Sequence, residues 1–225
     1  LGLPPTTQRT HVGHMGCFAA VPALSLASDA AAARGLTTLV VCAELPTIHI
    51  QPPTQEIDQV LAHALFADAV SAAIVKPGGN GLRILGVASR TVPAAADLMA
   101  WDVTDNGFRM RLSPDVPRAV EPHIGPLVTE LLGPRGLTPE DVATWGIHPG
   151  GPRILEVAAA RLGVGAERME ASHAVLREAG NCSSATLLLI LERILGAPPP
   201  AGSHIVGMAF GPGLTLTAAL MRYEG

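Results

Sequence analysis

The chain has 225 residues and a formal net charge of −4; 48% of its residues are apolar and 15% are charged. A chain of this length can bury a sizeable core in one large domain or two small ones. The small acidic excess and the absence of a Lys/Arg cluster argue against a nucleic-acid-binding surface.

Membrane insertion and secretion leave recognisable signals in a sequence. The apolar stretches near residues 70–75 and 185–191 are far shorter than the roughly 20 residues that cross a bilayer. No basic leader precedes an apolar stretch. We therefore expect a soluble cytoplasmic protein with no membrane partner.

Helix-like and strand-like segments of about 10–20 residues alternate, which predicts an α/β fold. The continuous apolar run over 36–43 (LTTLVVCA) is typical of a strand that is buried on both faces. In the first part of the chain we expect a helix over 18–34 that ends at Gly35, a strand over 36–43, a helix or helix-like loop over 55–67, and strands over 70–76 and 83–91.

In the second part, Thr138, Pro139 and Asp141 have the N-cap, N1 and N3 pattern of a helix start. We expect further helices over 117–132, 153–162 and 183–195, and strands over 204–210 and 214–222.

Three cysteines, Cys17, Cys42 and Cys182, form neither a CxxC pair nor an even set, so at least one is expected to be a free thiol. Cys17 lies in GHMGCFAA, directly before the helix expected over 18–34. A helix N-terminus favours the thiolate, and the small neighbours allow a tight turn like a nucleophile elbow. A buried structural cysteine fits this context equally well.

Two further polar residues lie beside turns. His148 precedes a Gly-rich turn in WGIHPGGP, and Asn181 precedes a helix in GNCSSA. Alone, His148 fits a structural histidine at a strand end, and Asn181 fits a helix N-cap. Neither residue identifies a function by itself.

Taken together, these motifs resemble the type III polyketide synthases, the chalcone-synthase-like branch of thiolase-fold condensing enzymes. Cys17 is followed by HPGGP, GN-x-SSA and FGPGLT, with 131 residues from Cys17 to His148 and 33 more to Asn181. The resemblance covers nearly the whole chain and implies a thiolase-like α/β fold with αβαβα layers. Residues 1–79 would be the end of the first half, with the nucleophile, and residues 80–225 the complete second half.

The resemblance implies that Cys17, His148 and Asn181 are catalytic. Cys17 would take an acyl-CoA starter as a thioester, and His148 and Asn181 would donate hydrogen bonds to the substrate oxygen. The starter would be extended by decarboxylative Claisen condensation with malonyl-CoA, with or without a following cyclisation. CoA thioesters would be the substrates, with no metal and no cofactor, and the chain would form a homodimer.

The resemblance also implies substrate-binding residues. Phe66, in ALFAD, matches a gatekeeper between the CoA tunnel and the cavity for the growing chain. Met110 matches a second gatekeeper, with Phe108 in its place if the register shifts by two residues, and His49 is a polar wall residue. The other expected contacts are Gly150, Gly151 and Arg153 beside the CoA arm, then Ser183 and Phe210, and then Gly211, Pro212 and Gly213 at the cavity floor.

Three alternative functions remain open. A ketoacyl synthase III-like enzyme would use an acyl carrier protein and a basic patch, which the scattered arginines do not form. A papain-like hydrolase also combines Cys, His and Asn, but HPGGP and GNCSSA are not its motifs. A non-catalytic partner subunit would not need all three residues.

The family's chains are longer than this sequence. Either it is part of a longer protein, whose preceding residues build the opening of the first half, or another chain supplies them; we expect the first. Without them, an apolar surface should be uncovered on the central sheet.

Overall fold

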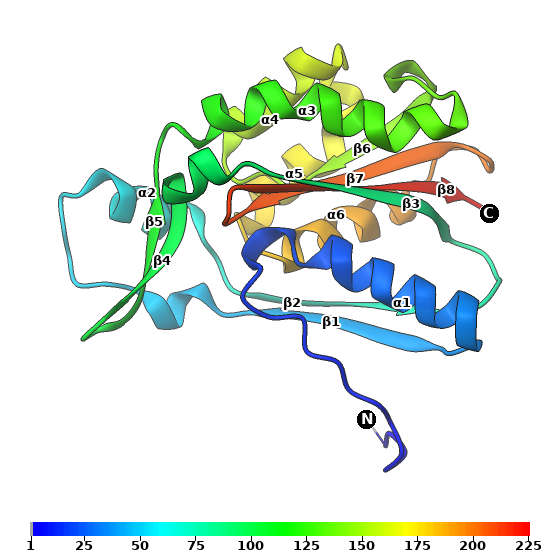
Figure 1. Cartoon of the computed structure of the whole chain (residues 1–225), viewed down its shortest axis with the longest axis horizontal. Helices are drawn as coiled ribbons and strands as arrows, with labels where there is room; N and C mark the ends of the chain where they lie inside the picture. The colour runs from blue at the N-terminus through cyan, green and yellow to red at the C-terminus, as the bar shows by residue number, and fades with distance from the viewer. Residues whose placement is uncertain (1) are drawn as a thin grey trace.

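The computed structural model describes residues 2–225 (Figure 1). The α-helices are α1 (Ala20–Arg34), α2 (Ile57–Leu65), α3 (Val116–Leu132), α4 (Pro152–Leu162), α5 (Glu170–Ala179) and α6 (Ala185–Gly196). The strands are β1 (Thr38–Glu44), β2 (Ala69–Val75), β3 (Leu82–Thr91), β4 (Met99–Thr104), β5 (Gly107–Leu112), β6 (Val142–Ile147), β7 (His204–Gly211) and β8 (Thr215–Tyr223).

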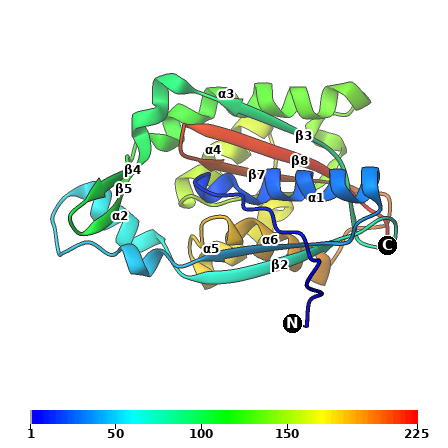
Figure 2. The same cartoon turned by 60° about the horizontal axis from the view of Figure 1, so that its bottom comes forward.

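The elements stack in alternating layers. The main sheet has the order β3-β8-β7-β6, in which the neighbours β6 and β7 pair in parallel and β8 runs antiparallel to both of its neighbours. β1 and β2 form a separate antiparallel ribbon. Helix α3 packs on β3 and β8 with α4 beside it, whereas α1 and α6 lie between the main sheet and the ribbon and contact both (Figures 1 and 2). The thiolase-type α/β architecture predicted from the sequence is confirmed.

Helix α1 fits between two sheets because three of its five buried residues are alanines, the others being Val21 and Leu24. Ala20, Ala27 and Ala31 are all buried, and short side chains allow close packing on both sides. The helix ends at Gly35, as predicted, where φ is +66°.

The prediction that the first strand is buried on both faces is wrong for the described chain. Val40 and Cys42 of β1 are buried, but Val41 between them is 53% exposed. Ile74, on the neighbouring strand β2, is 71% exposed. The cause is that, in the part of the chain described here, no layer covers the outer face of this ribbon. An uncovered apolar surface was expected on the central sheet, and the structure has it on the β1–β2 ribbon instead.

The helix predicted to start at Thr138 is also wrong. A capping box does form there, with the Thr138 N–H donating to Asp141 Oδ2 at 2.8 Å. Only a 3₁₀ turn over Pro139–Asp141 follows, because β6 then begins at Val142 and pairs with β7. The β4–β5 hairpin and α5 were not predicted.

One helical stretch has the length and composition of a membrane span, which the sequence analysis did not consider. It covers Gly16–Arg34, with 19 residues and a mean hydropathy of 1.4. Core helices of soluble proteins often meet the same criterion. Here α1, which makes up most of the stretch, packs against both sheets (Figure 2), and 33% of the apolar window is buried.

Candidate active site

Cys17 lies on a 3₁₀ turn, Gly16–Phe18, directly before α1. Its side chain is 4% exposed. Cys42 and Cys182 are buried as well, and all three thiols are free, which agrees with the prediction of at least one free thiol. The position at the start of a helix agrees with the sequence analysis.

The end of β7 holds this turn in place. A Cβ atom on Gly211 would lie 2.6 Å from Phe18 Cδ1, so only glycine permits the approach of the two segments. Gly16 has a φ of +64°, and a Cβ there would lie 2.8 Å from Pro212 Cδ. The loop after β7 therefore sets the position of the cysteine turn.

His148 follows β6, and its backbone N–H donates to the Met208 carbonyl of β7 at 2.8 Å. The residue is 1% exposed. Among residues 2–225, neither ring nitrogen of His148 has a hydrogen-bond partner. Because buried polar groups are normally paired, both nitrogens are available to a ligand.

Asn181 is fixed by its backbone and by its side-chain oxygen. Its N–H donates to the Leu65 carbonyl at 2.8 Å, and its carbonyl accepts from the Ala67 N–H at 2.9 Å. Its Oδ1 accepts from the Ser183 N–H at 2.9 Å, and Ser183 has an unusual φ of +50° for a residue with a side chain. The Asn181 NH₂ group is thus left free to donate.

The three residues meet in one cavity of about 330 Å³, here called the cysteine cavity. Most of its surface is apolar. Besides Cys17, His148 and Asn181, its walls contain five more of the residues expected to bind substrate: Phe66, Gly150, Gly151, Arg153 and Phe210.

Burial controls the charge of this site. Desolvation raises the pKa of Cys17 to about 12; a hydrogen bond with the Ser183 side chain opposes this, and the negative charge of Glu44 adds to it. Desolvation also lowers the pKa of His148 to about 4. The helix N-terminus therefore does not produce a thiolate in the unliganded protein, and at neutral pH both groups are uncharged.

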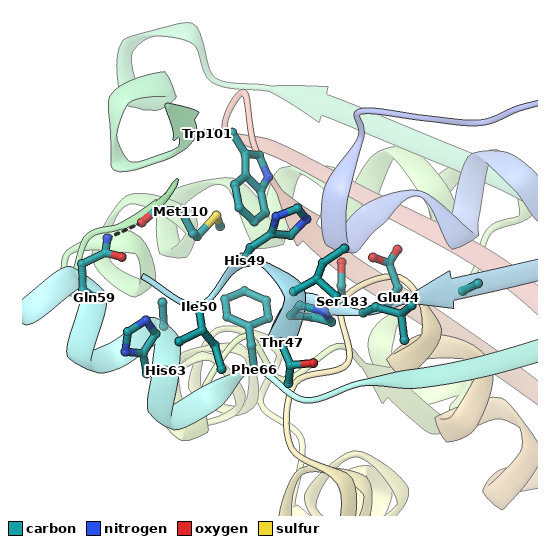
Figure 3. Close-up of a pocket in the computed structure, with 15 residues that line it drawn as sticks. Glu44, Thr47, His49, Ile50, Gln59, His63, Phe66, Trp101, Met110 and Ser183 are labelled. Carbon is teal, nitrogen blue, oxygen red and sulfur yellow. Dashed lines mark hydrogen bonds between the residues drawn. The ribbon is translucent and has the colours of Figure 1, made fainter. Parts of the chain in front are cut away.

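A second cavity of about 360 Å³ lies against the β4–β5 hairpin and is here called the hairpin cavity (Figure 3). Phe66 lines both cavities, so its ring lies between them. Met110 and Ser183, also predicted to contact substrate, line the hairpin cavity. The other labelled lining residues in Figure 3 are Glu44, Thr47, His49, Ile50, Gln59, His63 and Trp101.

Not every predicted residue lines a cavity. Gly211, Pro212 and Gly213 line neither of the two, and the first two pack against the cysteine turn instead. Phe108, the alternative to Met110, packs edge-on against His49 with ring centroids 5.7 Å apart. The roles of all these residues in substrate binding stay predictions.

The sequence analysis missed several residues of the hairpin cavity. Glu44 accepts a hydrogen bond from Ser184, and Gln59 donates to the hairpin backbone. Trp101 belongs to a hairpin that a signal could have revealed, because Asn106-Gly107 between alternating apolar residues is typical of a tight hairpin turn. Glu44 and Gln59 carry no such local signal.

Comparisons with known proteins place the chain in a family. Residues 84–223 match the family described as chalcone and stilbene synthases, C-terminal domain, and residues 1–79 match the N-terminal domain of the same family. The alpha-pyrone synthesis polyketide synthase-like protein Pks18 of Mycobacterium tuberculosis is 34% identical over 232 residues, which cover 98% of this chain and 58% of Pks18.

Solved structures give the same result. The 1,3,6,8-tetrahydroxynaphthalene synthase of Streptomyces coelicolor, a type III polyketide synthase, is 31% identical, with a TM-score of 0.94 over 100% of this chain and 65% of its own. PKS-I of the brown alga Ectocarpus siliculosus is 30% identical, with a TM-score of 0.91 over 99% of this chain and 62% of its own.

The chain therefore spans less than two thirds of the length of these relatives. The matches do not support the alternative of a condensing enzyme that depends on an acyl carrier protein. This chain belongs to the chalcone and stilbene synthase family, the type III polyketide synthases.

Proposed function

We propose that the protein containing this chain forms polyketides, by loading an acyl-CoA starter on Cys17 and extending it with malonyl-CoA. The observation that carries the proposal is the convergence of Cys17, His148 and Asn181 on one cavity, with Phe66 between it and a second cavity. The relatives, which are polyketide synthases or similar to them, support the same reaction class.

Loading begins from an uncharged pair, because burial disfavours the thiolate and the imidazolium separately. The Cys17 proton passes to His148 as the sulfur attacks the starter carbonyl carbon, so the two charges appear together and stabilise each other. The bond from the carbonyl carbon to the CoA sulfur breaks, and the CoA thiolate takes the proton back from His148. Cys17 now holds the acyl group.

Extension needs an enolate. Malonyl-CoA loses CO₂, and the electron pair of the broken C–C bond moves onto the thioester oxygen. A ring N–H of His148 and the NH₂ group of Asn181 would donate to this oxygen and stabilise the enolate. The enolate carbon attacks the Cys17 thioester and displaces the thiolate, so that the chain is two carbons longer and is carried by CoA.

The surroundings suit these steps. The Cys17 side of Phe66 would receive the CoA arm beside Gly150, Gly151 and Arg153, and the growing chain would pass Phe66 into the hairpin cavity. No metal or cofactor is part of the proposal. The electron pairs balance among the substrates and three side chains, and the thiolate that extension leaves on Cys17 takes up one proton from water. We further propose a cytoplasmic homodimer.

The direct test is product formation by the intact protein. We expect carbon-13-labelled malonyl-CoA and a series of acyl-CoA starters to give products that grow in two-carbon units, as measured by mass spectrometry. A Cys17→Ala variant should give none. Products that require malonyl-carrier protein and do not form from malonyl-CoA would contradict the proposal, and sedimentation would test the dimer.

A further inference from the structure

The free edge of the β4–β5 hairpin is bound by two glutamine side chains. β5 pairs with β4 along one edge only. On its other edge, Gln51 Nε2 donates to the Phe108 carbonyl at 3.1 Å, and Gln59 Nε2 donates to the Met110 carbonyl at 2.6 Å. Phe108 and Met110 are two residues apart, so the two amides occupy alternate positions along the strand, as a third strand would.

Both amides are buried, which makes these bonds specific. Gln51 is 8% exposed and Gln59 is 3% exposed. Gln51 Nε2 also donates to the His49 carbonyl at 3.1 Å, and the Gln51 backbone N–H donates to His63 Nε2 at 3.3 Å. Because a buried amide without a partner is costly, this arrangement holds the loop before α2, α2 itself and β5 in a single geometry.

The same helix carries the residue between the two cavities. Gln59, Ala62, His63 and Phe66 occupy positions i, i+3, i+4 and i+7, one face of α2 and its end, and all four line the hairpin cavity (Figure 3). The bond from Gln59 to Met110 therefore links the helix of Phe66 to the opposite wall of the cavity. Trp101 follows this wall, because it pairs with Met110 across the hairpin.

We propose that Gln51 and Gln59 are positioning residues that hold the hairpin against α2 and so limit the length of acyl chain that the hairpin cavity accepts. The inference deepens the proposed function and rests on it for the identity of the natural occupant. Without the two donors, the carbonyls of Phe108 and Met110 need water, and the hairpin moves away from α2. The cavity then accepts longer chains.

The test removes the donors but keeps the side-chain size, with Gln51→Met and Gln59→Met in the intact protein. Gln55→Met is the matched control, because Gln55 is exposed on the same segment. The probes are saturated fatty acids of increasing length. Their binding is measured by the change in fluorescence emission of Trp101, which lines the cavity. A Trp101→Phe variant identifies the signal.

For each methylene that is buried, affinity should rise about four-fold until the chain no longer fits. We expect this limit to move by about two carbons in Gln51→Met and Gln59→Met and to stay unchanged in Gln55→Met. Gln59→His, whose Nε2–H can replace the amide donor, should keep the length limit of the wild type. A merely structural role would weaken the signal at every length without moving the limit, and an unmoved limit in both variants would overturn the proposal.

Product lengths from malonyl-CoA give a second readout and separate the two proposals. A moved fatty-acid limit in a protein that forms no polyketide would support the positioning role and contradict the proposed function. Polyketide formation with the same fatty-acid length limit and the same product lengths in all variants would support the proposed function and contradict the positioning role. If Gln59→Met fails to fold, Gln51→Met and Gln59→His carry the same comparison.

Discussion

Phe66 and Asn181 lie opposite one another in an isolated parallel β-bridge. The hydrogen bonds of this bridge, at 2.8 and 2.9 Å, are made by the backbone of Asn181 with Leu65 and Ala67, on either side of Phe66. The ring between the two cavities and the amide donor beside Cys17 are therefore held by one unit of backbone. Changing the Phe66 side chain leaves this unit in place.

This relationship predicts the effect of Phe66→Ala. Removal of the ring joins the cysteine cavity to the hairpin cavity, while the backbone bridge still holds Asn181. We expect kcat/KM for a bulky starter to rise about ten-fold relative to that for a small starter. Steady-state kinetics with paired acyl-CoAs measure the ratio. Malonyl-CoA decarboxylation is the control and should stay near the wild-type rate; an unchanged starter ratio would show that Phe66 does not separate the cavities.

The hydrogen-bond donors His148 and Asn181 predict that removing either one slows the decarboxylation of malonyl-CoA. His148→Ala and Asn181→Ala should each lower malonyl-CoA decarboxylation about 100- to 1,000-fold, because each removes a donor to the enolate oxygen. Release of CO₂ in the absence of starter measures this step. Asn181→Ala should still load acyl groups on Cys17, since only His148 takes its proton. A wild-type rate in either variant would exclude that residue from the step.

Burial of His148 predicts a loss of stability in acid. The pKa of His148 is about 4 in the folded protein, below its ordinary value of 6.5, so between these pH values the unfolded state binds a proton that the folded state does not. The free energy of unfolding therefore falls by roughly 3 kcal/mol as the pH decreases from 6.5 towards 4, and this group does not change it above pH 6.5. Denaturant unfolding at several pH values measures it.

The matched variants are His148→Gln and His123→Gln, since His123 lines neither cavity. We expect the acid dependence to be smaller by that amount in His148→Gln and unchanged in His123→Gln. Identical pH profiles for wild type and His148→Gln would mean that the imidazole is not buried in its neutral form.

The close contact of Gly211 with the cysteine turn predicts that a larger residue at this position reduces acylation of Cys17 and leaves most of the fold intact. In Gly211→Ala the new methyl group would meet Phe18 and the Met15 carbonyl, at 2.6 and 3.1 Å, and displace the turn that carries Cys17. We expect acylation of Cys17 to fall at least about ten-fold, as measured by protein mass after incubation with acyl-CoA. Gly125→Ala is the control, because a Cβ there meets nothing within 4 Å; equal acylation in both would refute the positioning role of Gly211.

Local patterns predicted most elements of the fold. The Ala-rich helix that ends at Gly35 and the strand over 70–76 appear within a few residues of their expected limits. Exposure of Val41 depends on which layers cover the ribbon, and loss of the helix after Thr138 depends on the pairing of β6 with β7; no local pattern contains either. The β4–β5 hairpin was not predicted, although the turn before Gly107 has a recognisable sequence.

In the candidate site too, the sequence predicted some features, whereas others depend on contacts between distant segments. Cys17, His148 and Asn181 were ambiguous one by one, and only their order and spacing pointed to a single cavity. The direction of the Cys17 pKa could not be predicted, because desolvation depends on segments far away in the chain. The role of Gln59 could not be predicted either, because its hydrogen-bond partner is a backbone carbonyl 51 residues away in the chain.

The proposed synthesis depends most directly on Cys17 as the residue that carries the acyl chain. The decisive measurement is the mass of the intact protein before and after incubation with acyl-CoA, followed by peptide mapping of any adduct. We predict a single acyl group on the peptide that contains Cys17, and none in a Cys17→Ala variant. An adduct on Cys42 or Cys182, or turnover to polyketide in Cys17→Ala, would contradict the account.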